Sequence, residues 1–386
     1  MAEMLSQDSP PDLVLNRHCT ECEFQNRCRK KAIEKDDLSL LARMNEKERK
    51  KFNDKGIFTV TQLSYTFRPR RRPKRLRDKR EKYHHSLKAL AIREKKIHTV
   101  GNPELKIEGT PVYLDVEGLP DREFYYLIGL RIDNSKSAVQ HSLWADTEED
   151  EGKIWGEFLG ILETIKKPVL IHYGSYERTF IKRMSDRYGE PPDASVAAKA
   201  LQSLHDLLSV VFASIYFPTH SNGLKDIADS IGYKWTDALF SGIESIARRS
   251  KWEHSHNDIA KSHLLRYNAH DCEALSRVTE AVHSLAAQQA ISELHQSKDL
   301  NFVNTDLLKT QKKTKWGNFT SPVSSFEYVN SAAHWDYQKD RIYARTGKTP
   351  KNQRRVRRQR RKQKPIEKVI VWKTPNHCPN AGGKSV

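Results

Sequence analysis

The middle of the chain alternates hydrophobic and polar positions in a way that predicts strands followed by helices. Three β-rich runs are separated by short polar turns and predict an antiparallel meander: PVYLDVEG, FYYLIGLRID and AVQHSLWAD. An amphipathic stretch, GKIWGEFLGILETI, then predicts a helix, and the apolar run PVLIHYG predicts a fourth strand. We expect the next helix to begin at Ser175, where the residues SYER fit a capping arrangement.

From residue 195 to residue 286 the pattern is mostly helical. It ends in a long predicted helix with the sequence DIAKSHLLRYNAHDCEALSRVTEAVHSL. Three antiparallel strands, a helix, a fourth strand and further helices are typical of a mixed-sheet α/β domain. We therefore predict such a domain, with helices flanking the mixed sheet, over residues 111–290.

The segments outside this domain have weaker patterns. Residues 38–67 predict helices around a turn. Leu40, Leu41 and Met44 share one helical face. Phe52 begins a second apolar cluster, and Gly56 interrupts the helix before Ile57 and Phe58. The remaining ranges are a cysteine-containing segment over 1–37, a basic helix and linker over 68–110, and a basic region of low order over 291–386.

The charge of the chain changes this picture, because it is strongly positive. Its 386 residues include 67 lysines and arginines against 49 aspartates and glutamates, a net charge of +18. This excess favours a polyanionic partner, and we expect nucleic acid, either DNA or RNA. Two runs concentrate the charge, RPRRRPKRLRDKREK and KNQRRVRRQRRKQK, and they either bind phosphates or are simply solvated. The residues expected to bind nucleic acid are Arg70, Arg71, Arg72, Lys74, Arg75, Arg354, Arg355, Arg357 and Arg358.

The sequence carries neither a membrane signal nor a secretion signal. No run of eighteen or more apolar residues occurs, and the first residues, MAEMLSQDSPPD, lack a charged-then-apolar pattern. We therefore expect a cytoplasmic protein. Five cysteines, three of them crowded within ten positions, do not form a disulfide framework. In a cytosolic chain such crowding indicates a metal ion or a cluster.

The sharpest chemical signal is a set of spaced carboxylates. Asp115 and Glu117 are two residues apart on a predicted strand, so side-chain alternation puts both on one face. Two such carboxylates repel each other unless a cation lies between them, and Mg²⁺ prefers hard oxygen ligands. Tyr267 and Asp271 are four residues apart on the predicted long helix and also share a face. The alternative is that each is an ordinary strand or helix residue.

These side chains suit phosphodiester hydrolysis. A phenol beside a carboxylate can orient an attacking water while the carboxylate holds metal, and two metal ions about 4 Å apart stabilise the attacking and leaving oxygens. A further carboxylate is expected after the fourth strand. Glu177, at the start of a helix, is the candidate, and Asp206 is the alternative. A glutamate in the first turn also complements the helix dipole, which is the ordinary explanation for Glu177.

The order of these motifs resembles that of the DEDD 3′–5′ exonucleases of the ribonuclease-H-like fold, and more closely the YprB-type ribonuclease-H-like domain. The resemblance runs from residue 112 to about residue 285. Asp115 and Glu117 match the first motif, and Tyr267 and Asp271 match the third motif of the tyrosine subgroup. The resemblance implies hydrolysis of phosphodiester bonds, with Glu117 and Tyr267 as catalytic residues.

The second motif departs from the family pattern, because Glu177 stands where these exonucleases usually have aspartate. Glutamate reaches about one methylene further than aspartate, so metal geometry can survive the change. The resemblance implies two Mg²⁺ or Mn²⁺ ions, held by Asp115, Glu117, Glu177 and Asp271.

The cysteines near the start of the chain follow the spacing C-x2-C-x5-C. Cys19, Cys22 and Cys28 can hold Zn²⁺ or an iron–sulfur cluster, both of which usually have four ligands, or they are unligated thiols. The segment resembles the end of RecB-like nucleases that carry an iron–sulfur cluster, in which a further cysteine lies far upstream. Together with DDLSLLARM, KGIFTVTQLSYTFRPRRRPKR and YLDVEG, it resembles RecB-like nucleases fused to a YprB-type domain.

This second resemblance implies a truncated or split member of that family. A separately encoded RecB-like nuclease half would then be a partner and would complete the cluster. Residues 38–67 resemble a helix-hairpin-helix element, and the alternative is a small helical spacer.

We therefore expect a metal-dependent nuclease of the 3′–5′ exonuclease type. The alternatives are a catalytically degenerate nucleic-acid-binding module and a partner subunit of a separate RecB-like nuclease.

Overall fold

The structure is a computed structural model of the chain. It describes residues 13–16, 18–19, 22–69, 83–101, 103, 105–134, 137–235, 242–292, 302–305 and 308, all within a compact unit that ends at Thr310. The nine basic residues expected to bind nucleic acid lie outside the described residues: Arg70, Arg71, Arg72, Lys74, Arg75, Arg354, Arg355, Arg357 and Arg358.

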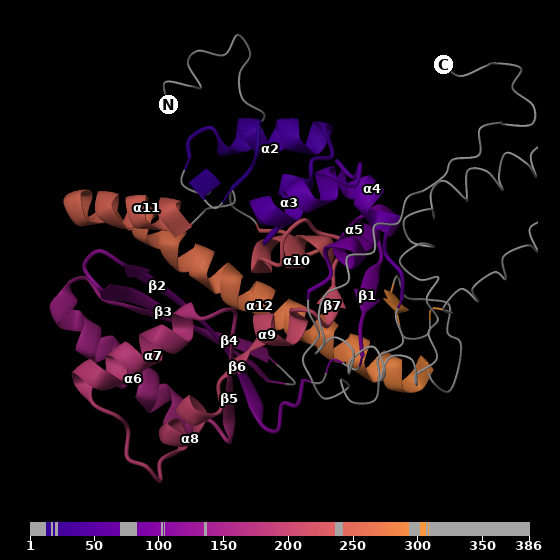
Figure 1. The fold of residues 1–386 in the computed structure, drawn as a ribbon. Coiled ribbons are helices and arrows are strands. Elements are labelled where there is room, and N and C mark those ends of the chain that lie inside the picture. Colours follow the sequence, from indigo (N-terminus) through magenta and orange to yellow (C-terminus); the bar gives the residue numbers. More distant parts are fainter. Residues whose placement is uncertain are drawn as a thin grey trace, which may run out of the picture. The chain divides into compact units, whose positions relative to one another are not determined.

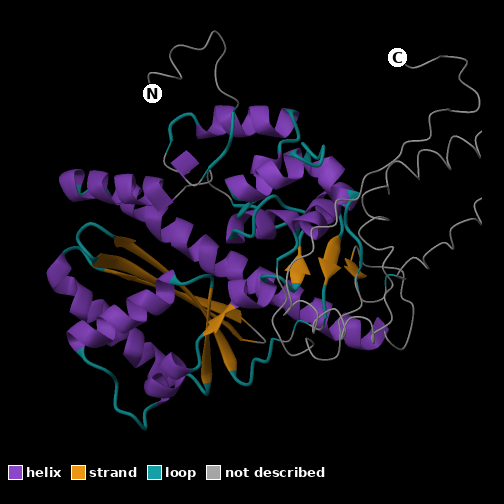
Figure 2. Ribbon diagram, viewed as in Figure 1, coloured by secondary structure: helices purple, strands orange, loops and turns teal. Residues whose placement is uncertain are grey.

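A five-stranded mixed sheet forms the centre of this unit, with the strand order β4-β3-β2-β5-β6. The first three strands form the antiparallel meander expected from the sequence: β2 (Thr110–Leu119), β3 (Phe124–Asn134) and β4 (Ser137–Trp144). β5 (Pro168–His172) pairs in parallel with β2, and the short β6 (His205–Asp206) pairs in parallel with β5. The mixed α/β fold predicted from the sequence is therefore confirmed (Figure 2).

Helices cover both faces of this sheet (Figure 1). On one face lie α6 (Glu151–Thr164), α7 (Tyr176–Tyr188) and α8 (Val196–Gln202), and a 3-10 turn, η4 (Glu148–Asp150), precedes α6. The long α12 (Asp258–Ser292) crosses the other face and contacts β2, β3 and β4. The remaining helices of this part are α9 (Leu207–Val211), α10 (Leu224–Ser230) and α11 (Gly242–Ser255).

Side-chain alternation along β2 determines which of its side chains face α6 and α7 and which face α12. Leu114 and Val116 belong to the apolar cluster that contains Phe158 of α6 and Phe180 of α7. Tyr113 belongs to a second cluster, which contains residues of α12. Because successive strand residues point to opposite faces, the residues two and four positions after Tyr113 face α12.

A second, three-stranded sheet joins segments that are distant in the sequence. β1 (Ile97–Thr99) pairs antiparallel with β7 (Ile215–Tyr216) and parallel with β8 (Phe302–Asn304). The sequence does not predict this sheet, because strands of two or three residues carry no measurable alternation. β1 lies in the range expected to be a linker, and β8 lies in the range expected to have low order.

The N-terminal part is helical, with α2 (Gln25–Glu34), the 3-10 turn η2 (Leu38–Leu40), α3 (Glu46–Asn53), α4 (Val60–Ser64) and α5 (His85–Glu94). The predicted helical face of Leu40, Leu41 and Met44 is wrong. These residues lie in and after η2, because a capping box between Asn45 and Glu48 starts the helix only at Glu46. Leu38 and Leu41 instead pack with residues of α4 and α5.

The structure also tests the expectations for Gly56 and Ser175. Gly56 has a φ of +73° and lies just after α3, as expected for a residue that interrupts a helix. Ser175 is the N-cap of α7, but its side chain makes no capping hydrogen bond, so that part of the prediction is wrong. No helix in the described part of the chain has the length and apolar character that a membrane crossing requires.

Candidate active site

Three carboxylates meet where β2 faces α12. Asp115 and Glu117 come from β2 and Asp271 comes from α12, and their ligand oxygens lie within 4.8 Å of one another. Asp115 and Glu117 are half-buried, and Asp271 is buried. Among the described residues, this is the only cluster of three or more potential metal-ligating side chains.

Asp115 is held by a buried amide from α12. The Nδ2 atom of Asn268 donates to Asp115 Oδ2 at 2.7 Å and to the Asp115 carbonyl oxygen at 3.0 Å. Gly129 of β3 lies opposite Asp115 in the strand register. A Cβ atom added at Gly129 would lie 1.9 Å from Asn268 Oδ1, so only glycine allows α12 to approach the sheet this closely.

Glu117 is held from α11. The Ser245 hydroxyl donates to Glu117 Oε2 at 2.8 Å, and Ser245 is itself almost fully buried. The register of the β2–β3 pair shifts between Glu117 and Gly118, so Glu117 lies at an irregularity of the ladder. Irregularities of this kind re-aim side chains near functional sites.

Two side chains, those of Trp235 and Tyr267, hydrogen-bond the Asp271 carboxylate. Trp235 Nε1 donates to Asp271 Oδ1 at 2.9 Å, and Tyr267, one helical turn earlier, hydrogen-bonds the same carboxylate. Lys225, from α10, places its Nζ atom 2.7 Å from the Tyr267 hydroxyl. A cation, a phenol and a carboxylate thus follow one another along this side of the cluster.

Crowding and burial disfavour ionisation of all three carboxyl groups. Burial, followed by repulsion from Asp271, raises the pKa of Asp115 well above its ordinary value. Burial raises the pKa of Glu117 to about 7, although the Ser245 hydrogen bond opposes the rise. Burial also raises the pKa of Asp271, against the opposing charge of Lys225. A divalent cation among these oxygens would relieve both the repulsion and the loss of hydration.

Glu177 lies at the edge of this cluster. It is buried at the start of α7, and its charge contributes to the raised pKa values of Asp115 and Glu117. Its Oε2 atom is 3.5 Å from Nδ1 of the buried His172 and has no hydrogen-bond partner among the described residues. A buried carboxylate oxygen without a partner fits a ligand position.

The alternative residue for this position, Asp206, has a structural role instead. Its Oδ1 atom accepts hydrogen bonds from the backbone nitrogens of Gly174, at 2.9 Å, and Leu208, at 3.0 Å. It thereby caps α9 and fixes the turn after β5. Glu177 is therefore the better candidate of the two.

The phenol of Tyr267 is held in its protonated form. Burial, followed by the carboxylates of Asp271, Glu117 and Asp115, raises its pKa above the usual range. A phenol with a raised pKa keeps its proton and can donate a hydrogen bond.

The three N-terminal cysteines do not form a comparable cluster. Cys22 is exposed, while Cys19 and Cys28 are partly exposed. The Asn16 backbone nitrogen donates to Cys19 Sγ at 3.3 Å. The three sulfur atoms form no group of potential metal ligands among the described residues.

Sequence reasoning missed the residues that hold the carboxylates and the phenol. They are Lys225, Trp235, Ser245 and Asn268. Asn268 directly follows Tyr267 in the motif, and Lys225 belongs to the GLKDIADSIG helix, so both carried a local signal. Ser245 and Trp235 carried none, because they reach the site only through tertiary packing.

Comparison with known proteins agrees with this architecture. Residues 112–283, less than half of the chain, match a family model described as the RNase_H superfamily. A search of curated proteins gave no match, and neither did a search of solved structures. The matched range contains all three clustered carboxylates and the five-stranded mixed sheet except for the first two residues of β2. Residues 112–283 therefore form a ribonuclease-H-like domain.

Proposed function

We propose that this protein is a divalent-metal-dependent nuclease that hydrolyses phosphodiester bonds of DNA or RNA in the manner of DEDD 3′–5′ exonucleases. The observation that carries this proposal is the approach of Asp115, Glu117 and Asp271 to within 4.8 Å inside a ribonuclease-H-like domain. Such a cluster is costly without a cation, since every carboxyl group in it has a raised pKa.

The donor set fits two Mg²⁺ or Mn²⁺ ions. Asp115, Glu117 and Asp271 would hold them together with Glu177, whose buried Oε2 atom has no hydrogen-bond partner in the described part of the chain. All four are hard oxygen donors, as these ions prefer. When bound, the ions supply positive charge that stabilises the attacking and leaving oxygens of a phosphodiester.

The protein's own residues orient the reacting groups. Tyr267, protonated and fixed by Lys225 at 2.7 Å, is placed to hydrogen-bond the hydrolytic water. Asn268 and Ser245 lock the Asp115 and Glu117 carboxylates, because each donates to a carboxylate oxygen from a buried position. Supporting hydrogen bonds of this kind commonly change metal affinity or activity by about 10–100-fold.

The resemblance to YprB-type domains and RecB-like nucleases adds a partner to the proposal. Cys19, Cys22 and Cys28 are all at least partly exposed, so their sulfur atoms are accessible to a ligand from another chain. A separately encoded RecB-like half would complete an iron–sulfur cluster with them in the cytoplasm. Visible absorption and iron content after anaerobic co-purification with such a chain, lost in Cys22→Ser, would test this part.

A binding module without hydrolysis is the second candidate. The contact between Glu177 and His172 favours it, because the imidazole lies 3.5 Å from the Oε2 atom that the second motif would offer to a metal ion and so occupies space beside it. The two candidates differ in one observable, which is metal-dependent cleavage.

The test is digestion of single-stranded DNA and RNA by the full chain with Mg²⁺ or Mn²⁺. We expect cleavage by the wild type, loss of cleavage in Asp115→Asn and Asp271→Asn, and no loss in Asp121→Asn, which removes an exposed carboxylate after β2. Salt-sensitive binding of both substrates without cleavage of either would select the binding module.

A further inference from the structure

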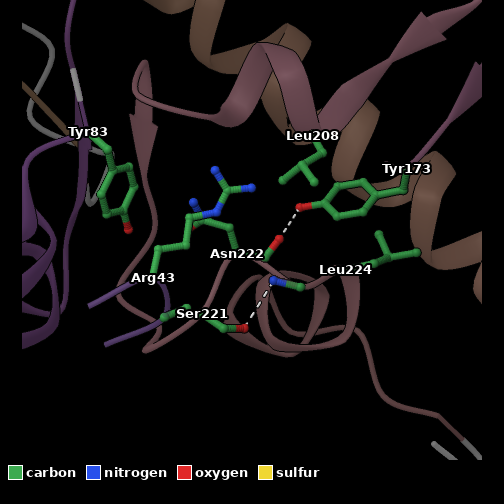
Figure 3. Close-up of a pocket in the computed structure, with 9 residues that line it drawn as sticks. Arg43, Tyr83, Tyr173, Leu208, Ser221, Asn222 and Leu224 are labelled. Carbon is green, nitrogen blue, oxygen red and sulfur yellow. Dashed lines mark hydrogen bonds between the residues drawn. The ribbon is translucent and has the colours of Figure 1, made fainter. Parts of the chain in front are cut away.

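A cavity of about 370 Å³ lies between the N-terminal helical part and the ribonuclease-H-like domain. The N-terminal part contributes Arg43 and Tyr83, and the domain contributes Tyr173, Leu208 and the loop that begins α10 (Figure 3). Its volume falls within the range of about 300–1,000 Å³ that small-molecule sites occupy. Arg43 and Tyr83, which line it, lie outside residues 112–283 of the family match.

The wall that carries α10 is fixed by a buried lysine of α5. The Nζ atom of Lys88 lies within hydrogen-bonding distance of four oxygens of this loop: Phe217 O at 3.0 Å, Thr219 Oγ1 at 3.0 Å, Ser221 O at 3.2 Å and Asn222 Oδ1 at 2.8 Å. The backbone nitrogen of Ala42 also donates to His220 O at 3.0 Å. These contacts hold the two parts together, so the cavity is a built feature of the fold.

Arg43 presents a cation to this cavity. Its guanidinium Cζ lies 4.4 Å from the centroid of the Phe212 ring, which fixes the side chain, and the residue remains exposed. Arg43 has a φ of +66°, a conformation that is uncommon outside glycine and that clusters at functional sites. None of the described residues that line the cavity is acidic.

Two aromatic rings stand on either side of this cation in Figure 3. Tyr83 stacks on Phe212, with ring centroids 5.1 Å apart and an angle of 10° between the planes. The Tyr173 hydroxyl donates to the carbonyl oxygen of Asn222, which holds its ring against the loop. Aromatic rings stack on nucleobases of any sequence, and guanidinium groups bind phosphate in a planar fork.

Two short stretches of chain connect the lining of the cavity with residues of the carboxylate site. Leu224 lines the cavity, and the next residue, Lys225, contacts Tyr267 at the cluster. Tyr173 lines the cavity four residues before Glu177, across the turn between β5 and α7. A chain bound at the carboxylates can therefore extend into the cavity.

We propose that this cavity binds one unpaired nucleotide of a single-stranded nucleic acid, with the base against the Tyr173 ring and a phosphate at Arg43. The inference rests on the proposed function, because it assigns the cavity to the strand that the carboxylates would cleave. It narrows the substrate to single strands, since a base within a duplex is stacked and paired and cannot enter a cavity of this size.

The test measures binding without cleavage. A labelled single strand of about twelve nucleotides is titrated with the full chain in EDTA and followed by fluorescence anisotropy. We expect Arg43→Ala to weaken binding at least about fivefold. Arg27→Ala, which removes an exposed arginine of α2, should change the Kd by less than about twofold. Tyr173→Leu should weaken binding, whereas Tyr173→Phe, which keeps the ring, should bind better than Tyr173→Leu. Circular dichroism and thermal melting verify that each variant is folded.

Three results would overturn the proposal. The first is equal binding by Arg43→Ala and either the wild type or Arg27→Ala. The second is an equal effect of Arg43→Ala on a duplex of the same sequence. The third is Arg43-dependent binding of a free nucleoside monophosphate that is tighter than binding of the strand, which would assign the cavity to a small effector.

The outcome is separable from that of the proposed function. Metal-dependent cleavage by the wild type together with unaltered binding by Arg43→Ala overturns only the cavity assignment. Arg43-dependent binding of single strands without cleavage by the wild type supports the cavity assignment and overturns the nuclease.

Discussion

The side-chain amide of Asn268 donates to the Asp115 carboxylate at 2.7 Å and to the Asp115 carbonyl oxygen at 3.0 Å. This contact joins the strand that carries two clustered carboxylates to the helix that carries the third. Asn268 is fully buried and precedes Asp271 by three residues on α12. The contact therefore sets the spacing between β2 and α12 at the level of the proposed metal site.

Replacing this amide should weaken metal binding. Asn268→Leu removes both hydrogen bonds to Asp115 while keeping a side chain of similar size, so we expect Mn²⁺ affinity to fall by about 10–100-fold. Isothermal titration with Mn²⁺ measures this directly. Unchanged affinity in a folded Asn268→Leu protein would mean that Asp115 does not need Asn268 for its position.

The glycine opposite Asp115 should be intolerant of any side chain. A Cβ atom in Gly129→Ala would lie 1.9 Å from Asn268 Oδ1, so we expect a loss of about 1–3 kcal/mol in the free energy of unfolding. Gly160→Ala is the matched control, because nothing lies within 4 Å of a Cβ atom there and α6 should gain about 0.5–1 kcal/mol. Urea unfolding of the two variants checks both signs, and equal stability would contradict the close approach of α12.

Local patterns predicted which residues of the strand and of the helix share a face, but not that these two faces lie against each other. The alternation of β2 put Asp115 and Glu117 on one face, and the helical period put Tyr267 and Asp271 on one face. That these two faces oppose each other depends on Gly129 and Asn268, which touch only in the tertiary structure. Four of the five strands of the large sheet were predicted for the same local reason, whereas β6, β1 and β8 are too short to leave a pattern.

The phenol and the lysine beside it should act as one unit. Tyr267→Phe removes the hydroxyl that we assign to the hydrolytic water, so we expect kcat to fall by about 10²-fold or more with little change in KM. Lys225→Met should lower kcat through the same hydroxyl, which its Nζ contacts at 2.7 Å. A double-mutant cycle then gives non-additive effects. Additive effects would show that Lys225 acts independently of Tyr267.

The raised pKa of Glu117 predicts how stability depends on pH in the metal-free protein. Because this pKa is about 7 in the folded state and 4.5 for an ordinary glutamate, the folded state keeps a proton that the unfolded state has lost. The resulting contribution is fully present below about pH 4.5 and is lost as the pH rises through about 7. We expect a decrease on the order of 1–3 kcal/mol across this window.

Urea unfolding in EDTA at about pH 5 and about pH 8 measures this decrease. Glu117→Gln should make the decrease smaller, because glutamine has no proton to lose, while Asp115 and Asp271, whose pKa values are also raised, retain part of it. Saturating Mg²⁺ should restore stability at the higher pH, since the ion binds the deprotonated carboxylates. The same pH profile in Glu117→Gln and in the wild type would contradict the assignment to Glu117.

The most direct test of the nuclease is the initial rate of hydrolysis of a 5′-labelled single strand as a function of Mn²⁺ concentration, for the wild type and for Asp271→Asn. Asp271 is the carboxylate that α12 contributes to the cluster, so its loss leaves only the two carboxylates of β2. We predict that the wild-type rate rises with Mn²⁺ and saturates, and that Asp271→Asn is slower by about 10²-fold or more. A wild type that hydrolyses neither DNA nor RNA at any Mn²⁺ concentration, or an Asp271→Asn protein as fast as the wild type, would contradict the account.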